Sequence, residues 1–374
     1  MRFEFATAGR IVFGPGTARE VAPAARSFAS RVFYVAGFDA LAGLEPAATL
    51  RVAGEPTVEL VREGVEAARA AGCGVVVAAG GGSAIDTGKA VAALFANGGD
   101  PLDYLEVIGR GQPLTRPSIP VIAVPTTAGT GAEVTRNAVL ASPEHGVKAS
   151  LRSPYMLPRA AIIDPELTVS LPPAITASTG LDALTQLIEP YVSVRANAMT
   201  DMFCLEGIAR AGRALRRAFS NGSDMDARMD MSFASLLGGL ALANAGLGAV
   251  HGFAAPIGGA FKAPHGAVCA ALLPHVMDVN IRALRARAPE SEALARYAAV
   301  ARVLTGDPGA APDDGAAAAA GLCAAVQIQG LRAWGVSEKD VPGLCANAAR
   351  ASSMKGNPIQ LTPAELDEIL RRAL

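Results

Sequence analysis

"VVVAAGGGSAIDTGKA", residues 75–90, joins an apolar run to a helical pattern through three consecutive glycines. The run is short, rich in valine and closed by glycine, which is typical of a buried strand. Residues 83–98 then show the periodicity of a helix and end at a glycine, as helices commonly do. The stretch therefore predicts a strand, a glycine turn and a helix in direct succession.

The same alternation continues on both sides of this stretch. An amphipathic pattern over residues 55–72 predicts a second helix, and short runs rich in Val, Ile and aromatic residues predict strands. The predicted strands are residues 10–14, 31–37, 74–80 and 121–125. Strands that alternate with helices favour a parallel sheet covered on both faces.

The character of the chain changes after a proline-rich stretch that runs from Pro165 to Pro173. Beyond about residue 174 almost no strand-like run remains, and long Ala- and Leu-rich helical patterns take over. A chain of 374 residues also exceeds the size at which one core usually splits into two. We therefore predict an α/β domain over residues 1–168 and an all-helical domain over residues 169–374.

Composition excludes several classes of protein. The chain is 51% hydrophobic with a net charge of -1, so nothing suggests a basic surface for nucleic acid. The five cysteines lie singly without CxxC spacing, which fits reduced thiols in a cytosolic protein. The amino terminus is charged and the longest apolar stretches are interrupted by glycine, unlike a signal peptide or a membrane span. We expect a soluble cytoplasmic protein without nucleic-acid or membrane partners.

The glycine turn offers bare backbone amides at the amino terminus of a predicted helix. Unpaired N–H groups and the helix dipole both favour an anion at such a place. The candidates for binding a phosphate are Gly80, Gly81, Gly82 and Ser83. Ser83 and Asp86 also match a capping box. The turn is not a GxGxxG fingerprint, and by itself it fits a phosphate cradle and tight packing equally well.

A second turn, "VPTTAGTGAEVT" at residues 124–135, follows another predicted strand. It gathers hydroxyl groups and exposed amides, which suit a diphosphate or a ribose. Its candidate binding residues are Thr126, Thr127 and Thr130. The alternative interpretation is an ordinary polar loop.

The second half of the chain contains the residue types of a metal site. Asp182 and Gln186 stand four residues apart, which places both side chains on one face of a helix. His251 and His265 flank a glycine-rich stretch further along. One carboxylate and two imidazoles form a ligand set that Fe(II) favours and that serves Zn(II) equally well. An amide is a weak neutral ligand, so Gln186 indicates either no metal site or one in which a stronger ligand has been replaced.

Six ordered motifs resemble the successive signatures of the iron-containing, group III alcohol dehydrogenases. They are "GGGSAIDTGKA", "PTTAGTGAEVT", "IIDPELT", "GLDALTQLIEPYVS", "GAVHGFAAPIGG" and "PHGAVCAALLPHVM". The resemblance implies a dehydroquinate synthase-like fold, in which a Rossmann-like domain binds NAD(P) and a helical domain binds a divalent metal. The metal ligands that it implies are Asp182, Gln186, His251 and His265, and the catalytic residues are Asp182, His251 and His265.

Two positions depart from the family pattern. The family has histidine where this chain has Gln186, and it usually has a further histidine, thought to relay protons, where this chain has Ala255. A glutamine could still coordinate through its carbonyl oxygen, which makes the site harder and weakens its binding of late transition metals.

The resemblance leaves both NAD and NADP as candidate cofactors. An acidic residue at the end of an early strand holds the NAD ribose in dinucleotide folds. The resemblance would place that acid at about Gly37, and Asp39 follows two positions later. Lys148 matches a family lysine near the nucleotide, although a solvated loop lysine explains it nearly as well.

The expected protein is a cytoplasmic, homodimeric NAD(P)-dependent alcohol dehydrogenase that moves a hydride to or from a small alcohol, aldehyde or ketone. Its metal is expected to be Fe(II), with Zn(II) as the second candidate. One alternative is an enzyme like the maleylacetate reductases of the same superfamily. The other is a nucleotide-binding sensor with impaired catalysis.

Overall fold

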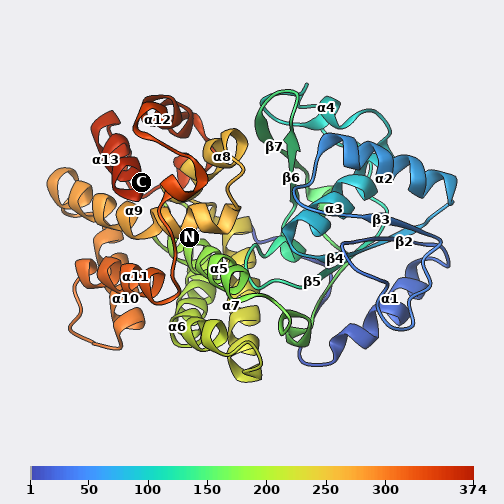
Figure 1. Ribbon diagram of the computed structural model, residues 1–374, viewed down its shortest axis with the longest axis horizontal. Helices are drawn as coiled ribbons and strands as arrows, with labels where there is room; N and C mark the ends of the chain where they lie inside the picture. Colours follow the sequence, from blue (N-terminus) through green and yellow to red (C-terminus); the bar gives the residue numbers. More distant parts are fainter. Residues whose placement is uncertain (1) are drawn as a thin grey trace. The chain divides into compact units, whose positions relative to one another are not determined.

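The computed structural model describes residues 2–374, which form two compact units. The sheet unit comprises residues 6–127 and 131–169, and the helical unit comprises residues 2–5, 128–130 and 170–374. Figure 1 labels the helices and strands of both units, apart from β1 and β8. The main break in the chain therefore falls between residues 169 and 170.

A six-stranded parallel sheet forms the centre of the sheet unit, in the order β1-β8-β5-β4-β2-β3. Its strands are β1 (Ile11–Phe13), β2 (Val32–Ala36), β3 (Ala48–Arg51), β4 (Val75–Gly80), β5 (Val121–Pro125) and β8 (Ala160–Ile163). The four strands predicted from apolar runs are confirmed. The sequence patterns missed β3, a half-exposed edge strand, and β8, half of which is alanine. Gly80 lies opposite Pro125, so the turns that follow β4 and β5 are neighbours.

Helices cover both faces of this sheet, as alternation of strands and helices predicted. They are α1 (Val21–Phe28), α2 (Val58–Ala70), α3 (Gly82–Asn97) and the short α4 (Pro101–Tyr104). Phe33 and Val35 of β2 belong to the core that includes residues of α2 and α3. Tyr34 and Ala36 point to the opposite core, which includes residues of α1. Successive side chains of one strand thus fill two separate cores.

A two-stranded antiparallel ribbon completes the sheet unit and was not predicted. It consists of β6 (Asn137–Ser142) and β7 (Val147–Arg152). Buried and partly exposed residues alternate along β6, so its apolar signal is too weak to be seen as a continuous run. The ribbon is joined to α3 by the amide of Val139, which donates to the carboxylate of Asp86 at 2.9 Å.

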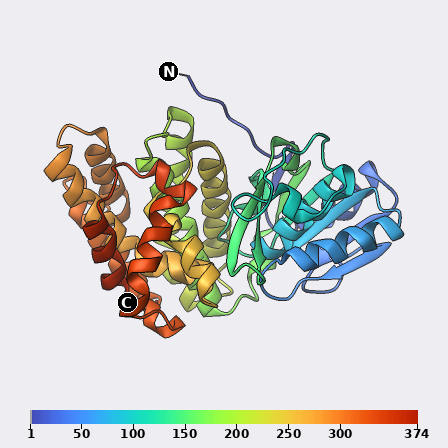
Figure 2. The ribbon, with the colours of Figure 1, turned by 90° about the horizontal axis from the view of Figure 1, so that it is seen from above.

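The helical unit consists of helices that lie side by side, seen from green to red in Figure 2. They are α5 (Pro173–Val192), α6 (Ala198–Ser220), α7 (Met225–Ala245), α8 (Ala249–Ala260), α9 (His265–Arg287), α10 (Glu292–Thr305), α11 (Pro312–Ala325), α12 (Val341–Arg350) and α13 (Pro363–Ala373). The predicted change to helical structure is confirmed. α5 is buried along nearly its whole length and packs against α6, α7 and α9.

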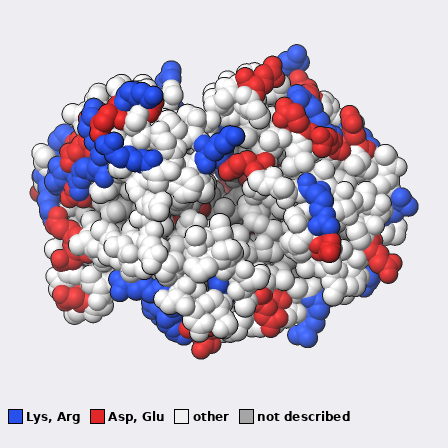
Figure 3. Space-filling model, in the orientation of Figure 1, with Lys and Arg blue, Asp and Glu red and all other residues white. Residues whose placement is uncertain are grey.

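One helix is apolar enough to raise the question of a membrane span. Within residues 2–374, α9 alone has the length and hydropathy of a span, and α7 with α8 reaches them only as a pair bent by 99°. The apolar window of α9 is 78% buried inside the protein, as in the core helix of a soluble domain. On the face shown in Figure 3, basic and acidic side chains are interspersed.

Close contact between α3 and β4 depends on Gly88. A Cβ atom added there would lie 2.5 Å from the Cβ of Ala78, which is much closer than two carbon atoms can approach. We predict that Gly88→Ala destabilises the protein by about 1–3 kcal/mol because the helix must move away from the sheet. The midpoint of urea denaturation, followed by circular dichroism, measures the effect.

Gly343→Ala is the matched control, since its added Cβ meets nothing within 4 Å and it also lies in a helix, α12. We expect it to be neutral or to gain up to about 1 kcal/mol, the helix-propensity difference between the two residues. Equal midpoints for Gly88→Ala and Gly343→Ala would contradict the packing argument.

Candidate functional site

Four potential donor atoms converge inside the helical unit. Asp182 comes from α5, His251 from α8, and His265 and Cys269 from α9. One ligand atom from each lies within 4.8 Å of all the others. The Oδ1 atom of Asp182 is 3.5 Å from Nε2 of His251 and 3.7 Å from Nε2 of His265. Three of the four residues predicted as metal ligands are therefore brought together.

The fourth predicted ligand, Gln186, lies beside this cluster on α5. Its Nε2 donates to Oδ2 of Asp182 at 3.0 Å, one helical turn away. Its Oε1 is buried and has no hydrogen-bond partner, and neither has Oδ1 of Asp182. A buried polar oxygen without a partner is unfavourable, by roughly 1–3 kcal/mol, unless another group satisfies it. The unpartnered Oδ1 of Asp182 is the oxygen that faces the imidazoles of His251 and His265.

Glycine allows the helices of the cluster to approach one another. A Cβ on Gly266 would lie 2.4 Å from the carbonyl oxygen of Ser178, so the start of α9 rests directly on the backbone of α5. Gly238 of α7 leaves only 3.4 Å between its own Cβ position and the Cβ of Gln186. The residue after His265 must therefore be small, and this contact brings His265 close to Asp182.

Glu189 orients the imidazole of His251. Its Oε2 is 2.6 Å from Nδ1 of His251, and its Oε1 accepts from the amide of Val250 at 2.7 Å. With Nδ1 engaged, the Nε2 atom of the ring is left to face Asp182. A carboxylate that holds the far nitrogen of a histidine is a common companion of metal ligands, because it fixes both the tautomer and the ring orientation.

Glu189 was not among the residues predicted from the sequence. Its signal was present, since Asp182, Gln186 and Glu189 follow the spacing i, i+4 and i+7 on one face of α5. The spacing alone does not say which partner the third side chain meets. That partner comes from α8, which begins sixty residues further along the chain.

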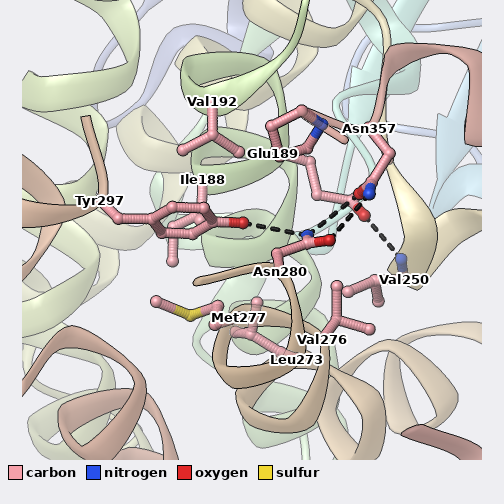
Figure 4. A pocket seen from close by; sticks show the side chains of 12 residues that line it. Ile188, Glu189, Val192, Val250, Leu273, Val276, Met277, Asn280, Tyr297 and Asn357 are labelled. Atoms are coloured by element: carbon pink, nitrogen blue, oxygen red, sulfur yellow. Dashed lines mark hydrogen bonds between the residues drawn. The ribbon is translucent and has the colours of Figure 1, made fainter. Parts of the chain in front are cut away.

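A buried network of polar side chains forms hydrogen bonds to the beginning of α8. Figure 4 shows it lining a small pocket, in which Glu189, Asn357, Asn280 and Tyr297 lie in succession. The Oδ1 atom of Asn357 accepts from the amide of Ala249 at 3.2 Å and from Nδ2 of Asn280 at 3.1 Å. Asn280 also donates to the hydroxyl of Tyr297 at 3.1 Å. The first two backbone amides of α8, those of Ala249 and Val250, thus donate to the side chains of Asn357 and Glu189.

Electrostatic coupling within the cluster is strong. Burial alone would raise the pKa of Asp182, but His265 and His251 beside it lower that pKa below its usual value. The neighbouring Cys269 raises the pKa of His265 to about 8, against the effect of burial. Burial would lower the pKa of His251, yet Cys269, Glu189 and Asp182 together raise it. The carboxylates of Asp182 and Glu189 are the groups that hold the two imidazoles in this arrangement.

The glycine turn in the sheet unit joins β4 to α3. Gly81 is the N-cap of α3, and no side chain caps this helix. The predicted capping box of Ser83 and Asp86 is therefore wrong, because the N-cap is two residues before Ser83. Asp86 instead pairs with Lys89 at 2.9 Å and accepts from Val139. Without a capping side chain, the backbone N–H groups at the start of α3 are left for an anion.

The two predicted nucleotide turns meet at the carboxyl end of the sheet. The amide of Thr126 donates to the carbonyl of Gly80 at 2.9 Å, and a Cβ on Gly81 would lie 3.4 Å from the side chain of Thr127. In open parallel sheets ligands bind outside this edge. Thr130 belongs by its contacts to the helical unit, and Lys148 lies on β7, where it forms an ion pair with Glu55 at 3.0 Å.

The other two histidines lie outside the cluster. His145 contacts the hydroxyl of Ser142 through Nδ1 at 2.8 Å, in the turn between β6 and β7. His275 lies ten residues after His265 on α9, and burial lowers its pKa. Ala255, where the family resemblance suggested a relay histidine, is exposed on α8.

Known families match both the sheet unit and the helical unit of the chain. Residues 8–165 match the family described as iron-containing alcohol dehydrogenase, and residues 176–374 match the C-terminal part of the Fe-containing alcohol dehydrogenase family. Alcohol dehydrogenase 4 of Schizosaccharomyces pombe is 38% identical over 320 residues, which cover 85% of this chain and 73% of that protein.

Two further relatives extend the comparison. The NAD-dependent methanol dehydrogenase of Bacillus methanolicus is 34% identical over 340 residues, which cover 89% of this chain and 86% of that enzyme. A crystal structure of 1,3-propanediol oxidoreductase superimposes with a TM-score of 0.90 at 34% identity, and the match covers 100% of both chains. The chain therefore belongs to the family of iron-containing alcohol dehydrogenases.

Proposed function

We propose that Asp182, His251 and His265 hold a divalent metal and that the turn after β4 binds the diphosphate of NAD(P). As a member of its family, the protein is an NAD(P)-dependent alcohol dehydrogenase, which moves a hydride between the nucleotide and a small alcohol, aldehyde or ketone. The convergence of donor atoms within 4.8 Å, with Oδ1 of Asp182 buried and lacking a hydrogen-bond partner, supports the metal site most directly.

The three side chains fit a divalent ion by their chemistry and by their supports. Asp182 supplies a negative oxygen, and Gln186 holds its other oxygen through a hydrogen bond. Glu189 holds His251 so that Nε2 faces the cluster. One carboxylate and two imidazoles suit Fe(II) and Zn(II). We propose Fe(II) as the resident ion and Zn(II) as the second candidate, and direct coordination by Gln186 stays a prediction.

A divalent ion held by Asp182, His251 and His265 would act as a Lewis acid, which would lower the pKa of an alcohol or polarise a carbonyl group. Asp182 and His251 are buried, at 1% and 6% exposed, whereas the side chain of His265 is 39% exposed and opens the cluster on one side. Ala255 has a methyl group and cannot carry a proton, so proton exchange with solvent does not use a side chain at that position.

The nucleotide proposal rests on the backbone of the turn after β4. The uncapped amino terminus of α3 and the glycines before it allow a diphosphate to approach the amides closely. A Cβ on Gly37, after β2, would lie 2.9 Å from the carbonyl oxygen of Val52, so an acidic side chain does not fit there. Asp39 instead forms an ion pair with Arg51. We therefore propose that NADP is accepted as well as NAD, because no unpaired acid opposes the 2′-phosphate at these two positions.

The cellular setting is also a proposal. The five cysteines are free and buried, which suits the reducing cytoplasm.

On family grounds we propose a homodimer of this 37.9 kDa chain. Light scattering of the purified protein is expected to give twice the mass of one chain, and the mass of a single chain would exclude the dimer.

Gly81→Val tests the nucleotide site. The nearest atoms to an added Cβ are those of Thr127 at 3.4 Å, so a side chain can be accommodated in the fold but would stand where the diphosphate must approach. We predict NAD(P)H affinity weakened at least tenfold, with a urea midpoint close to that of the wild type. Binding is measured by the change in NADH and NADPH fluorescence. Unchanged affinity in a folded variant would exclude the assignment of this turn.

His265→Ala tests the metal site with little damage to packing, because the His265 side chain is 39% exposed. We predict that bound metal, measured by mass spectrometry after anaerobic reconstitution, falls from about one ion per chain to a small fraction. Reduction of aldehydes by NAD(P)H should fall by several orders of magnitude.

Glu189→Gln should weaken metal binding by about 10–100-fold, since the orientation of His251 is loosened.

His145→Ala is the matched control, because this histidine lies in a turn of the sheet unit and contacts Ser142. It should retain both the metal and the activity. If His265→Ala bound the metal as tightly as His145→Ala, the proposed ligand set would be wrong.

A further inference from the structure

Cys269 lies on the same face of α9 as His265, one helical turn further on. The segment His265-Gly-Ala-Val-Cys269 begins the helix, so the i and i+4 side chains project in the same direction. The Sγ atom of Cys269 is 3.7 Å from Nε2 of His265 and 3.9 Å from Nε2 of His251. The thiol therefore faces the two nitrogen atoms that face Asp182.

These distances are close to those around a single tetrahedral ion. Zn–S bonds of about 2.3 Å and Zn–N or Zn–O bonds of about 2.0–2.1 Å place sulfur about 3.6 Å from each nitrogen, and oxygen about 3.4 Å from nitrogen. The corresponding separations here are 3.7 and 3.9 Å for sulfur, and 3.5 and 3.7 Å for Oδ1 of Asp182. A contraction of about 0.1–0.3 Å would bring these four pairs to the tetrahedral distances.

Cys269 differs from the other cysteines in its surroundings. Cys204 is equally buried, at 0% exposure, but it is not among the clustered metal-ligating side chains. Cys323 contacts a backbone carbonyl of α9, that of Ala270, at 3.4 Å. Of the cysteines in residues 2–374, Cys269 alone belongs to a group of residues able to hold a metal.

Gln186 is already engaged in a way that suits a supporting role. Its Nε2 donates to Oδ2 of Asp182, which leaves Oδ1 directed at the two imidazoles. Gln186 thus acts on Asp182 through a hydrogen bond and is a positioning residue.

We propose that the thiolate of Cys269 is the fourth protein donor to the metal, with Asp182, His251 and His265. It supplies the fourth donor that the family pattern provides with a histidine at position 186. This inference rests on the proposed metal site and adds a sulfur ligand to it. A thiolate is a softer donor than an imidazole or an amide oxygen, so it raises the affinity of the site for Zn(II) relative to an all-nitrogen and oxygen set.

The first test uses the unaltered protein. Zinc-loaded protein is examined by X-ray absorption at the zinc edge, where a Zn–S distance of about 2.3 Å is expected. Cobalt-loaded protein is expected to show the near-ultraviolet absorption of a thiolate bound to Co(II). A metal-bound protein with neither signal would overturn the sulfur ligand and leave the metal site standing. A wild type that binds no metal would instead overturn the proposed site itself.

The second test compares two buried cysteines. Cys269→Ser should lose the cobalt–thiolate absorption and bind zinc about tenfold or more weakly in a chelator competition. Cys204→Ser, which removes an equally buried thiol from α6, should retain both. Retention of the absorption band in Cys269→Ser would exclude Cys269 as its source.

Gln186→Ala distinguishes the glutamine from the cysteine. If Cys269 is the fourth donor, this variant keeps the cobalt–thiolate absorption and weakens metal binding only through the loss of a hydrogen bond to Asp182. A larger loss of zinc affinity in Gln186→Ala than in Cys269→Ser would reverse the assignment, because the amide would then be the stronger ligand.

Discussion

The carboxylate of Glu189 makes the two contacts on which the geometry of the donor cluster of Asp182, His251, His265 and Cys269 depends. One of its oxygens holds Nδ1 of His251 at 2.6 Å, and the other accepts the amide of Val250 at 2.7 Å. The same group therefore orients an imidazole and satisfies an amide in the first turn of the helix that carries it. Because Glu189 lies on α5 with Asp182, the position of His251 is set relative to Asp182 by a rigid helix.

Close contact between the backbones of α5 and α9 places the remaining side chains of the cluster. α9 can begin beside α5 because Gly266 has no side chain where the carbonyl of Ser178 lies. His265 and Cys269 then follow along one face of α9, as Asp182 and Gln186 do along one face of α5. Together α5, α8 and α9 bring one potential ligand atom from each of four side chains within 4.8 Å of the others, namely Asp182, His251, His265 and Cys269.

The differences between this chain and its family can be understood together. Glutamine at position 186 donates a hydrogen bond to Asp182 and is at most a weak ligand. Cys269 stands close enough to both histidines to replace the missing donor. In the proposed site, a sulfur donor in place of a nitrogen donor keeps the number of protein donors at four. It makes the donor set softer, and so changes the order of its affinities for different metals.

Much of the fold and part of the site were predictable because their signals are local. Valine-rich runs and helical periodicity identified β4 and α3, and the spacing of Asp182 and Gln186 identified a shared helix face. The strands β3 and β8 were not predicted, because short strands with alanine or polar residues carry little apolar signal. The roles proposed for Glu189 and Cys269 depend on contacts between α5, α8 and α9, which are far apart in the sequence. Residue spacing determined which side chains share a helix face, whereas packing between helices decided which faces meet, because the distance between two helices depends on the volumes of all the side chains between them.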